Sequence, residues 1–380
     1  MAIRTVYVGG GNGSAVTSPG AGSYANLTAA ELAERANLVS TTTELVIVLE
    51  DGTYTETAAV NFTSANWTTD ATYSITIQGD TAFGALVRIT TDTYSDVITI
   101  GAGVDHVTLE DFIIDHQGPS ASSANRGLTI SSGSEGSVAQ RMFLKGQSPG
   151  RVGGSSSGVG IVKNSVCIGY VAGINVFSYG TISHCTCISL GSSGGGIDCQ
   201  NATGTSVEHS YAYCSGTPDD LDESTATFAT QTNVHTADSS GDTGSVAYST
   251  ANFTNVTAGT EDFSLPVGSA LIGAASGSTE TEDIRGRTRS DPEDVGAYER
   301  TGEVYINDAA TLDGGEVLQT YPSSWSDTSL TMPDAPVTTG LSGQLYVIVE
   351  NADGSIGSRA VTVGSASIDY PILVPTGPIR

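Results

Sequence analysis

The sequence predicts an all-β fold: a right-handed parallel β-helix with an N-terminal capping helix, followed by a small C-terminal β-sandwich. Three observations lead to this prediction. The chain of 380 residues has 47 glycines and only 14% charged residues, which suits tight turns and stacked strands better than long helices. Short apolar runs alternate with turn signals along most of the chain. A glycine followed by an apolar strand also recurs at a nearly constant step.

One helical segment is expected near the N-terminus. Thr28 and Glu31 have the spacing of a capping box, and helix formers follow them, so a capping helix is predicted over about 28–39. It is well placed to cover the first coil, whose open edge would otherwise template aggregation. Short β-strands are then expected at 45–49, 74–77, 86–89, 97–100 and 107–114.

The repeat is clearest between residues 127 and 209. The openings Gly127–Ile130, Gly173–Val176 and Gly196–Cys199 are alike, and they are separated by 46 and then 23 residues. A second strand begins, coil by coil, at Val138, Val162, Ile182 and Val207. A period drifting between 20 and 25 residues, with two or three short strands in each unit, is typical of a parallel β-helix whose coils stack about 4.8 Å apart.

Stacked coils also predict vertical side-chain ladders. Cys167 and Cys187 are 20 residues apart and should lie on adjacent coils, as should Ile168 and Ile188. The five cysteines are odd in number and lack paired C-x-x-C spacing, which argues against a complete disulfide framework or a zinc knuckle. We therefore interpret them as core residues: Cys167, Cys185, Cys187, Cys199 and Cys214.

The end of the predicted solenoid carries a recognisable closing motif. Residues 262–269 read D-F-S-L-P-V-G-S, and residues 283–299 run from D-I-R-G-R to D-V-G-A-Y-E. These elements resemble those that close the right-handed β-helix domains of many bacterial surface proteins and phage virion proteins. The resemblance covers roughly residues 5–300 and departs at Ala270 and Gly273, where the family often has Pro and Asp. It implies a β-helix domain over 1–300 and leaves activity open, because the family's functions vary widely.

A different pattern begins after Arg300. Strands are expected at 304–306, 329–332 and 345–349, with turns at 313–315 and 351–354. The segment 325–328 before a strand, and a later strand ending at Glu350, resemble immunoglobulin-type modules of the transcription-factor and plexin kind. Residues 301–380 are therefore predicted to form an Ig-like β-sandwich that ends in an extended, proline-rich tail from Tyr370.

Charge limits the partners of the chain. The 41 acidic and 14 basic residues give a net charge of −27, which repels nucleic acid and anionic membranes, so neither is expected as a partner. No run of about 20 apolar residues is present to span a bilayer. The first residues, Met1 to Val6, lack the apolar run of a secretory signal, although the Gly/Ser/Thr-rich composition resembles that of proteins that work outside cells. A removed signal and release by cell lysis, as for virion components, are the two explanations, and the retained Met1 favours release by lysis.

Five residues are candidates for chemistry. A polysaccharide-cleaving β-helix needs two carboxylates about 5–10 Å apart, which adjacent coils can supply. The candidates are Asp198, Glu208, His184, His209 and Asp111. His184 and His209 occupy equivalent places in successive repeats, so their side chains are expected to stack. Asp, Asn and His also favour turns, because they hydrogen-bond their own backbone. A structural role in turns is therefore the main interpretation, with catalysis and a cation site as alternatives, and no cofactor or metal is expected.

These observations favour a non-enzymatic virion structural protein of a tailed phage, as a surface appendage, spike or capsid decoration. Its expected partners are capsid or tail proteins and cell-surface polysaccharide, the latter contacted through the Ig-like module or the tail. A homotrimer is common among such spikes and is compatible with the sequence. A polysaccharide depolymerase (hydrolase or lyase) and a bacterial surface adhesin are the alternatives.

Overall fold

The computed structural model describes residues 2–9, 23–81, 84–89, 96–116, 126–146, 148–152, 159–191, 194–201, 203–217, 219–257, 260–266, 268–289 and 292–300. Beyond residue 300 it describes the strands at 303–307, 317–318, 324–326, 329–331, 345–350 and 356–361. Of the N-terminal region, residues 10–22 lie outside the described part of the chain.

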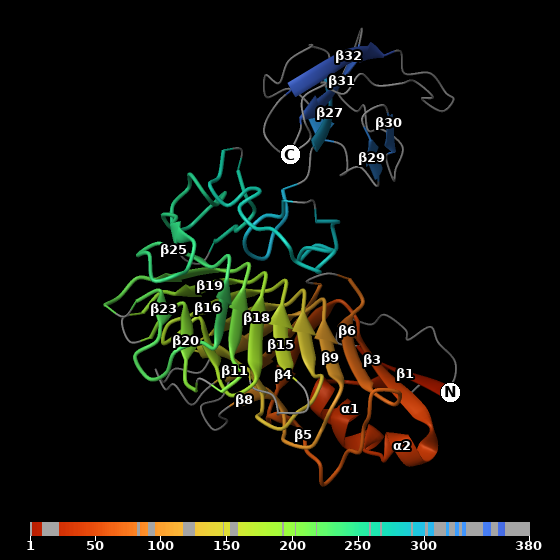
Figure 1. Ribbon diagram of the computed structural model, residues 1–380. Coiled ribbons are helices and arrows are strands. Elements are labelled where there is room, and N and C mark those ends of the chain that lie inside the picture. Colours follow the sequence, from red (N-terminus) through yellow and green to blue (C-terminus); the bar gives the residue numbers. More distant parts are fainter. Residues whose placement is uncertain are drawn as a thin grey trace.

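Three parallel sheets run side by side along the N-terminal domain (Figure 1). Sheet 1 has ten strands, in the order β2 (Ser23–Tyr24), β1 (Ala2–Val8), β3 (Thr43–Leu49), β6 (Ile75–Gly79), β9 (Val107–Glu110), β12 (Val138–Gln140), β15 (Gly160–Lys163), β18 (Gly180–Ser183), β21 (Ser206–Glu208), β24 (Thr230–Thr232). Sheet 2 has nine, namely β4 (Gly52–Glu56), β7 (Ala85–Ile89), β10 (Ile113–His116), β13 (Phe143–Gly146), β16 (Val166–Gly169), β19 (Thr186–Ser189), β22 (Tyr211–Cys214), β25 (His235–Thr236), β26 (Gly244–Ser245). Sheet 3 has seven, namely β5 (Val60–Phe62), β8 (Asp96–Ile100), β11 (Arg126–Ile130), β14 (Ser148–Val152), β17 (Ile174–Val176), β20 (Ile197–Cys199), β23 (Leu221–Asp222).

From β3 to β25, every third strand returns to the same sheet. Each coil visits sheet 1, then sheet 2, then sheet 3, and the next coil hydrogen-bonds to it in parallel. Parallel crossovers of this kind are right-handed. The predicted right-handed parallel β-helix is therefore confirmed.

Identical core positions stack from coil to coil. On sheet 1 one inward ladder is directly paired along its whole length, and every member is fully buried: Ile47, Ile77, Leu109, Ala139, Val162, Ile182, Val207. Removing these side chains from water drives the stacking, because each Ile, Leu or Val contributes about 1.5–3 kcal/mol on full burial, and Ala139 less. The sequence placed Val138 in this ladder, and that register is wrong by one residue. Val138 is only partly buried, whereas Ala139 faces the core.

The predicted cysteine ladder is confirmed. Cys167 of β16 pairs directly with Cys187 of β19, and both thiols are buried and free. Ile168 and Ile188 pair in the same way but point to the opposite face, where they pack in a second apolar cluster outside the solenoid. The glycine register is also confirmed, since a Cβ on Gly173 would lie 2.1 Å from the carbonyl oxygen of Gly196 on the next coil.

Two short helices, rather than one, lie at the N-terminal end. Helix α1 (Leu27–Glu34) contacts β5, β1, β2 and β4, and α2 (Leu38–Thr41) contacts β3. The expected capping box is wrong, because Asn26 is the N-cap and its side chain accepts from the backbone N–H of Ala29. The Thr28 hydroxyl instead donates to Glu56, a carboxylate fully buried in the first coil. The hydrogen bond ties the helix to the solenoid end.

The closing motif packs along the side of the solenoid rather than across its end. Phe253, Phe263 and Ile284 join a cluster with Val166 and Tyr211, which point outward from sheet 2. The aromatic rings of Tyr211, Phe253 and Phe263 meet edge to face. Residues 246–299 thus cover an apolar outer face that the last coils would otherwise expose to water.

The C-terminal strands form antiparallel sheets. One has the order β28 (Val317–Leu318), β27 (Glu303–Asn307), β31 (Leu345–Glu350), β32 (Ile356–Val361), and a hairpin joins β29 (Ser324–Ser326) to β30 (Ser329–Thr331). An Ig-like arrangement and a domain boundary at residue 300 stay predictions. The turns expected at 313–315 and 351–354 and the tail from Tyr370 lie outside the described residues. Among the described helices, none has both the length and the apolar character needed to cross a bilayer.

Candidate functional site

The corner between sheets 1 and 2 is built from one left-handed residue per coil. Six successive coils place a non-glycine residue there with φ between 47° and 64°, and we call this set the turn ladder: Asp111, Arg141, Asn164, His184, His209, Asn233. Asn, Asp and His tolerate this conformation better than other residues with side chains. The predicted structural role of His184, His209 and Asp111 in turns therefore agrees with their backbone geometry.

Residues 276–300, here called the closing segment, run beside the turn ladder. Asn233 donates to the carbonyl of Ser276, and Arg141, four coils further toward the N-terminus, pairs with Glu282 at 3.4 Å. The segment then returns, and the backbone N–H of Gly296 donates to the carbonyl of His209. The closing segment thus spans five successive coils.

Arg289 is the anchor of the closing segment. Its side chain is completely buried and donates to Asn164, to Glu299 and to backbone carbonyls, including that of Gly296 at 2.9 Å. Burial lowers the pKa of Arg289, and the surrounding carboxylates, Glu299 foremost, oppose that shift. Because the buried guanidinium of Arg289 is held by this many acceptors, it fixes the closing segment in one position.

Asp111 is engaged in an ion pair. Both of its oxygens accept from Arg141, at 2.8 and 2.7 Å, and Arg141 also pairs with Glu110 at 2.9 Å. Although Glu110 and Asp111 are consecutive residues, both carboxylates reach the same guanidinium, because Asp111 has a left-handed backbone conformation. This role is structural.

His184 and His209 stack as expected from their equivalent places. Their ring centroids lie 4.7 Å apart with an interplanar angle of 7°. The Nε2 atom of His184 lies 3.0 Å from Glu293 of the closing segment, and its Nδ1 atom lies 3.1 Å from the Ser183 hydroxyl. Because a carboxylate only accepts, Nε2 carries the proton and Nδ1 accepts from Ser183. Burial and then Arg289 lower the pKa of His184 to about 2, so the imidazole is neutral at physiological pH.

The same three residues form the one cluster in the described part of the chain with metal-ligating atoms close together. The ligand atoms of His184, His209 and Glu293 lie within 4.8 Å of one another. An imidazole binds a metal through a lone pair in the plane of its ring, and the lone pairs of two parallel rings do not converge on one ion. The neighbouring Arg289 adds positive charge that lowers the pKa of both imidazoles. This arrangement fits a packing contact rather than a metal centre.

Asp198 lies apart from these residues, on sheet 3. It is the central residue of β20 and pairs directly with Asn175 on one neighbouring strand and Asp222 on the other. Gln200 donates to its Oδ2, whereas the buried Oδ1 has no hydrogen-bond partner among the described residues. Desolvation, followed by the charge of Asp222, raises the pKa of Asp198 to about 6.

Asp198 and Asp222 together make a carboxyl pair. Directly paired residues on adjacent parallel strands share a face and are separated by about 4.8 Å. Two carboxyl groups so placed, one with a raised pKa, can divide the roles of proton donor and nucleophile. The sequence predicted Asp198 but not Asp222, because the irregular spacing of the last coils hides the register of β23.

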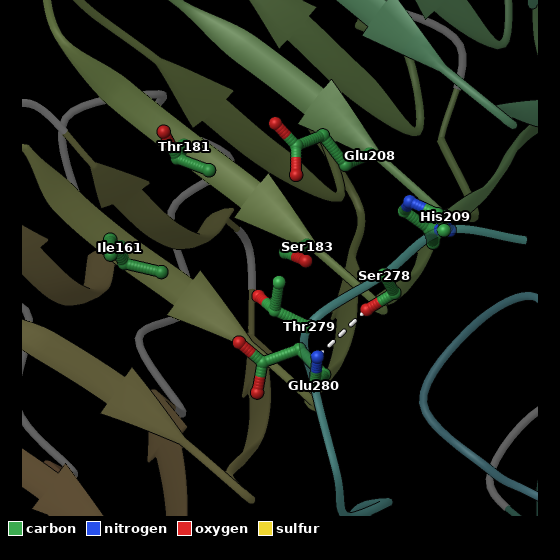
Figure 2. A pocket seen from close by; sticks show the side chains of 9 residues that line it. Ile161, Thr181, Ser183, Glu208, His209, Ser278, Thr279 and Glu280 are labelled. Carbon is green, nitrogen blue, oxygen red and sulfur yellow. Dashed lines mark hydrogen bonds between the residues drawn. The ribbon is translucent and has the colours of Figure 1, made fainter. Parts of the chain in front are cut away.

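Glu208 borders a different feature, a pocket of about 280 Å³ beneath the closing segment. The pocket lies on the outer face of sheet 1 and is lined by Ile161, Thr181, Ser183, Glu208, His209, Gly277, Ser278, Thr279, Glu280. Figure 2 shows Glu208 on the strand side and Glu280 on the closing segment, with Thr181 and Ser183 on the strand next to Glu208. Burial and then the charge of Glu280 raise the pKa of Glu208.

The candidate residues therefore divide among three places. His184, His209 and Asp111 belong to the turn ladder, Asp198 lies on sheet 3, and Glu208 lines the pocket. Sequence reasoning missed Arg289, Glu293 and Glu280, all from the closing segment. Their contacts join positions more than 100 residues apart, and only the closing motif around 283–299 signalled that this segment was structured.

Comparisons with known proteins assign the chain to no family. No protein-family model matches the chain, and no curated protein matches it. One similar solved structure is a pectin methylesterase in complex with a hexasaccharide. It shares 16% sequence identity over 61% of this chain and 78% of its own, with a TM-score of 0.42.

Proposed function

We propose that the protein is a non-enzymatic structural component on the surface of a tailed-phage particle. The observation that carries this proposal is the structural use of the turn ladder, into which three of the five candidate residues are built. The closing segment ties five successive coils together through Arg289, Glu293 and its other contacts. A solenoid braced along its side is a stiff rod, which suits display outside a cell.

The test is to purify virions produced from the genome that encodes this chain and to locate the protein in them. Mass spectrometry of density-gradient-purified particles should detect the chain in stoichiometric amount. Immunogold electron microscopy with antibodies against the full chain should then label the particle surface. Absence of the chain from purified particles would refute the proposal.

A second function, polysaccharide cleavage, is favoured by the carboxyl pair on sheet 3. In a retaining glycoside hydrolase the two carboxyl groups are about 5–5.5 Å apart, close to the spacing of adjacent coils. In such a reaction Asp198, with its pKa of about 6, would donate the proton to the leaving group and Asp222 would attack the sugar.

This second candidate is tested by assaying release of reducing ends from bacterial capsular polysaccharides. If it is correct, Asp198→Asn abolishes product release, and Asp219→Asn, an exposed change nearby, leaves it intact. Product release that persists in Asp198→Asn would exclude this site as the source of the activity.

A further inference from the structure

We infer that the pocket beneath the closing segment binds a single neutral sugar ring, with the Glu208 carboxylate accepting hydrogen bonds from its hydroxyl groups. The inference does not depend on where the protein resides. It starts from the pocket itself, whose volume of about 280 Å³ lies just below the roughly 300–1,000 Å³ typical of pockets for drug-sized ligands. The ligand is therefore small.

The polar groups around the pocket differ in how much hydrogen-bonding capacity they have left for a ligand. The Thr181 hydroxyl is bonded to Ser206 at 2.9 Å, and the Ser183 hydroxyl is bonded to His184. Glu280 is neutralised by Lys163, whose Nζ lies 3.0 and 2.9 Å from its two oxygens. These groups shape the pocket, but their bonding capacity is largely used within the protein.

Glu208 differs from these three groups. It projects from β21, is half-buried, and its carboxylate has no hydrogen-bond partner among the described residues. Its oxygens remain open to water, and a ligand that displaces this water must donate hydrogen bonds in its place. The pocket therefore calls for a ligand rich in hydrogen-bond donors.

The surroundings favour hydroxyl donors over a cation. With Glu280 paired to Lys163, the pocket offers only one free carboxylate, whereas calcium takes six to eight oxygen ligands. Ile161 and the methyl group of Thr181 line the pocket with apolar surface, which suits the C–H face of a sugar ring. A sugar acid would be repelled by Glu208 and by the net charge of −27. A neutral hexose supplies hydroxyl donors, presents an apolar C–H face and carries no negative charge.

The experiment titrates the full-length chain with glucose, galactose and mannose by ligand-observed saturation-transfer NMR. Glucuronate, ethylammonium and calcium are the comparison probes. Saturable binding of at least one neutral hexose is expected, with no binding of glucuronate. Glu208→Gln should weaken it by about ten- to a hundredfold, the worth of a hydrogen bond to a charged group. Thr181→Phe, which fills the pocket, should abolish it.

The matched control is Glu44→Gln. Glu44 is a partly exposed glutamate on β3 of the same sheet, outside the pocket, and its replacement should leave hexose affinity unchanged. Circular dichroism melts establish that each variant is folded. The inference is overturned if no neutral hexose saturates the wild type, if a folded Glu208→Gln variant binds as well as the wild type, or if ethylammonium or calcium binds more tightly than the sugars.

Discussion

Replacing Asp198 by Asn should stabilise the protein at neutral and alkaline pH. The folded state raises the pKa of this carboxyl from 3.8 to about 6, which means that ionising it costs free energy in the fold but not in the unfolded chain. At 1.36 kcal/mol per pKa unit the cost is at most about 3 kcal/mol, and residual solvent access reduces it to about 1–3 kcal/mol. Asn keeps the shape and can still accept from Gln200.

The sign of the effect defines the pH window. Above pH 6 the wild type bears the full cost, between about pH 6 and 4 the folded state retains the proton and the cost declines, and below the ordinary pKa it vanishes. The advantage of Asp198→Asn should therefore be largest at pH 8 and shrink toward pH 4.

Urea denaturation followed by circular dichroism measures this advantage at pH 8, 6 and 4. Asp219→Asn is the matched control, since Asp219 is exposed, and it should change stability by less than about 0.5 kcal/mol at each pH. Two results would show that Asp198 is not desolvated beside Asp222. In the first, the Asp198→Asn variant is no more stable than the wild type at pH 8, and in the second, its gain in stability at pH 4 equals that at pH 8.

Three further results are expected. Arg289→Met should remove the cation that pairs with the buried Glu299 carboxylate and the donor to Asn164, and destabilise the fold by about 3–5 kcal/mol, with earlier proteolysis of the closing segment. Cleavage at the wild-type rate would contradict the role of Arg289 as anchor. Gly173→Ala should lower the melting temperature by several degrees, because its Cβ would meet a backbone carbonyl at 2.1 Å; an unchanged melt would mean that the coils are not in this register. His184→Gln should reduce the loss of folding stability below pH 6.5 by up to about 1.4 kcal/mol per pH unit. The lowered pKa of His184 keeps its imidazole neutral in the folded state, whereas the unfolded chain binds the proton. If urea titrations of the variant give the same dependence of stability on pH as the wild type, a neutral, buried His184 is contradicted.

The β-helix could be predicted because its coils repeat in sequence. Wherever glycine and apolar residues recur at the coil period, as at Gly173 and Gly196 or at Cys167 and Cys187, the predicted neighbours are in contact. The register failed at Val138, where both it and Ala139 are apolar and only packing decides which one faces the core. The sequence pattern thus predicts the length of each coil better than it predicts which residues of a strand face the core.

The candidate sites were harder to predict because their partners are distant in sequence. The stacking of His184 on His209 follows from the repeat, but the carboxylate that holds His184 comes from Glu293, 109 residues away. Glu280 reaches the pocket of Glu208 in the same non-repetitive way. The closing segment does not repeat in sequence, so its sequence gives no signal of which side chains it will contact.

The stacking of coils is tested most directly by distances between spin labels on one outward ladder of sheet 1. Thr76 and Thr230 are joined through six directly paired steps, and Thr108 and Thr230 through five. The five native cysteines are buried, so cysteines introduced at these positions can be labelled selectively. At about 4.8 Å per step, electron–electron double resonance should give backbone separations near 29 and 24 Å. Distances that do not shorten by about one step between the two pairs would contradict a stack of successive coils.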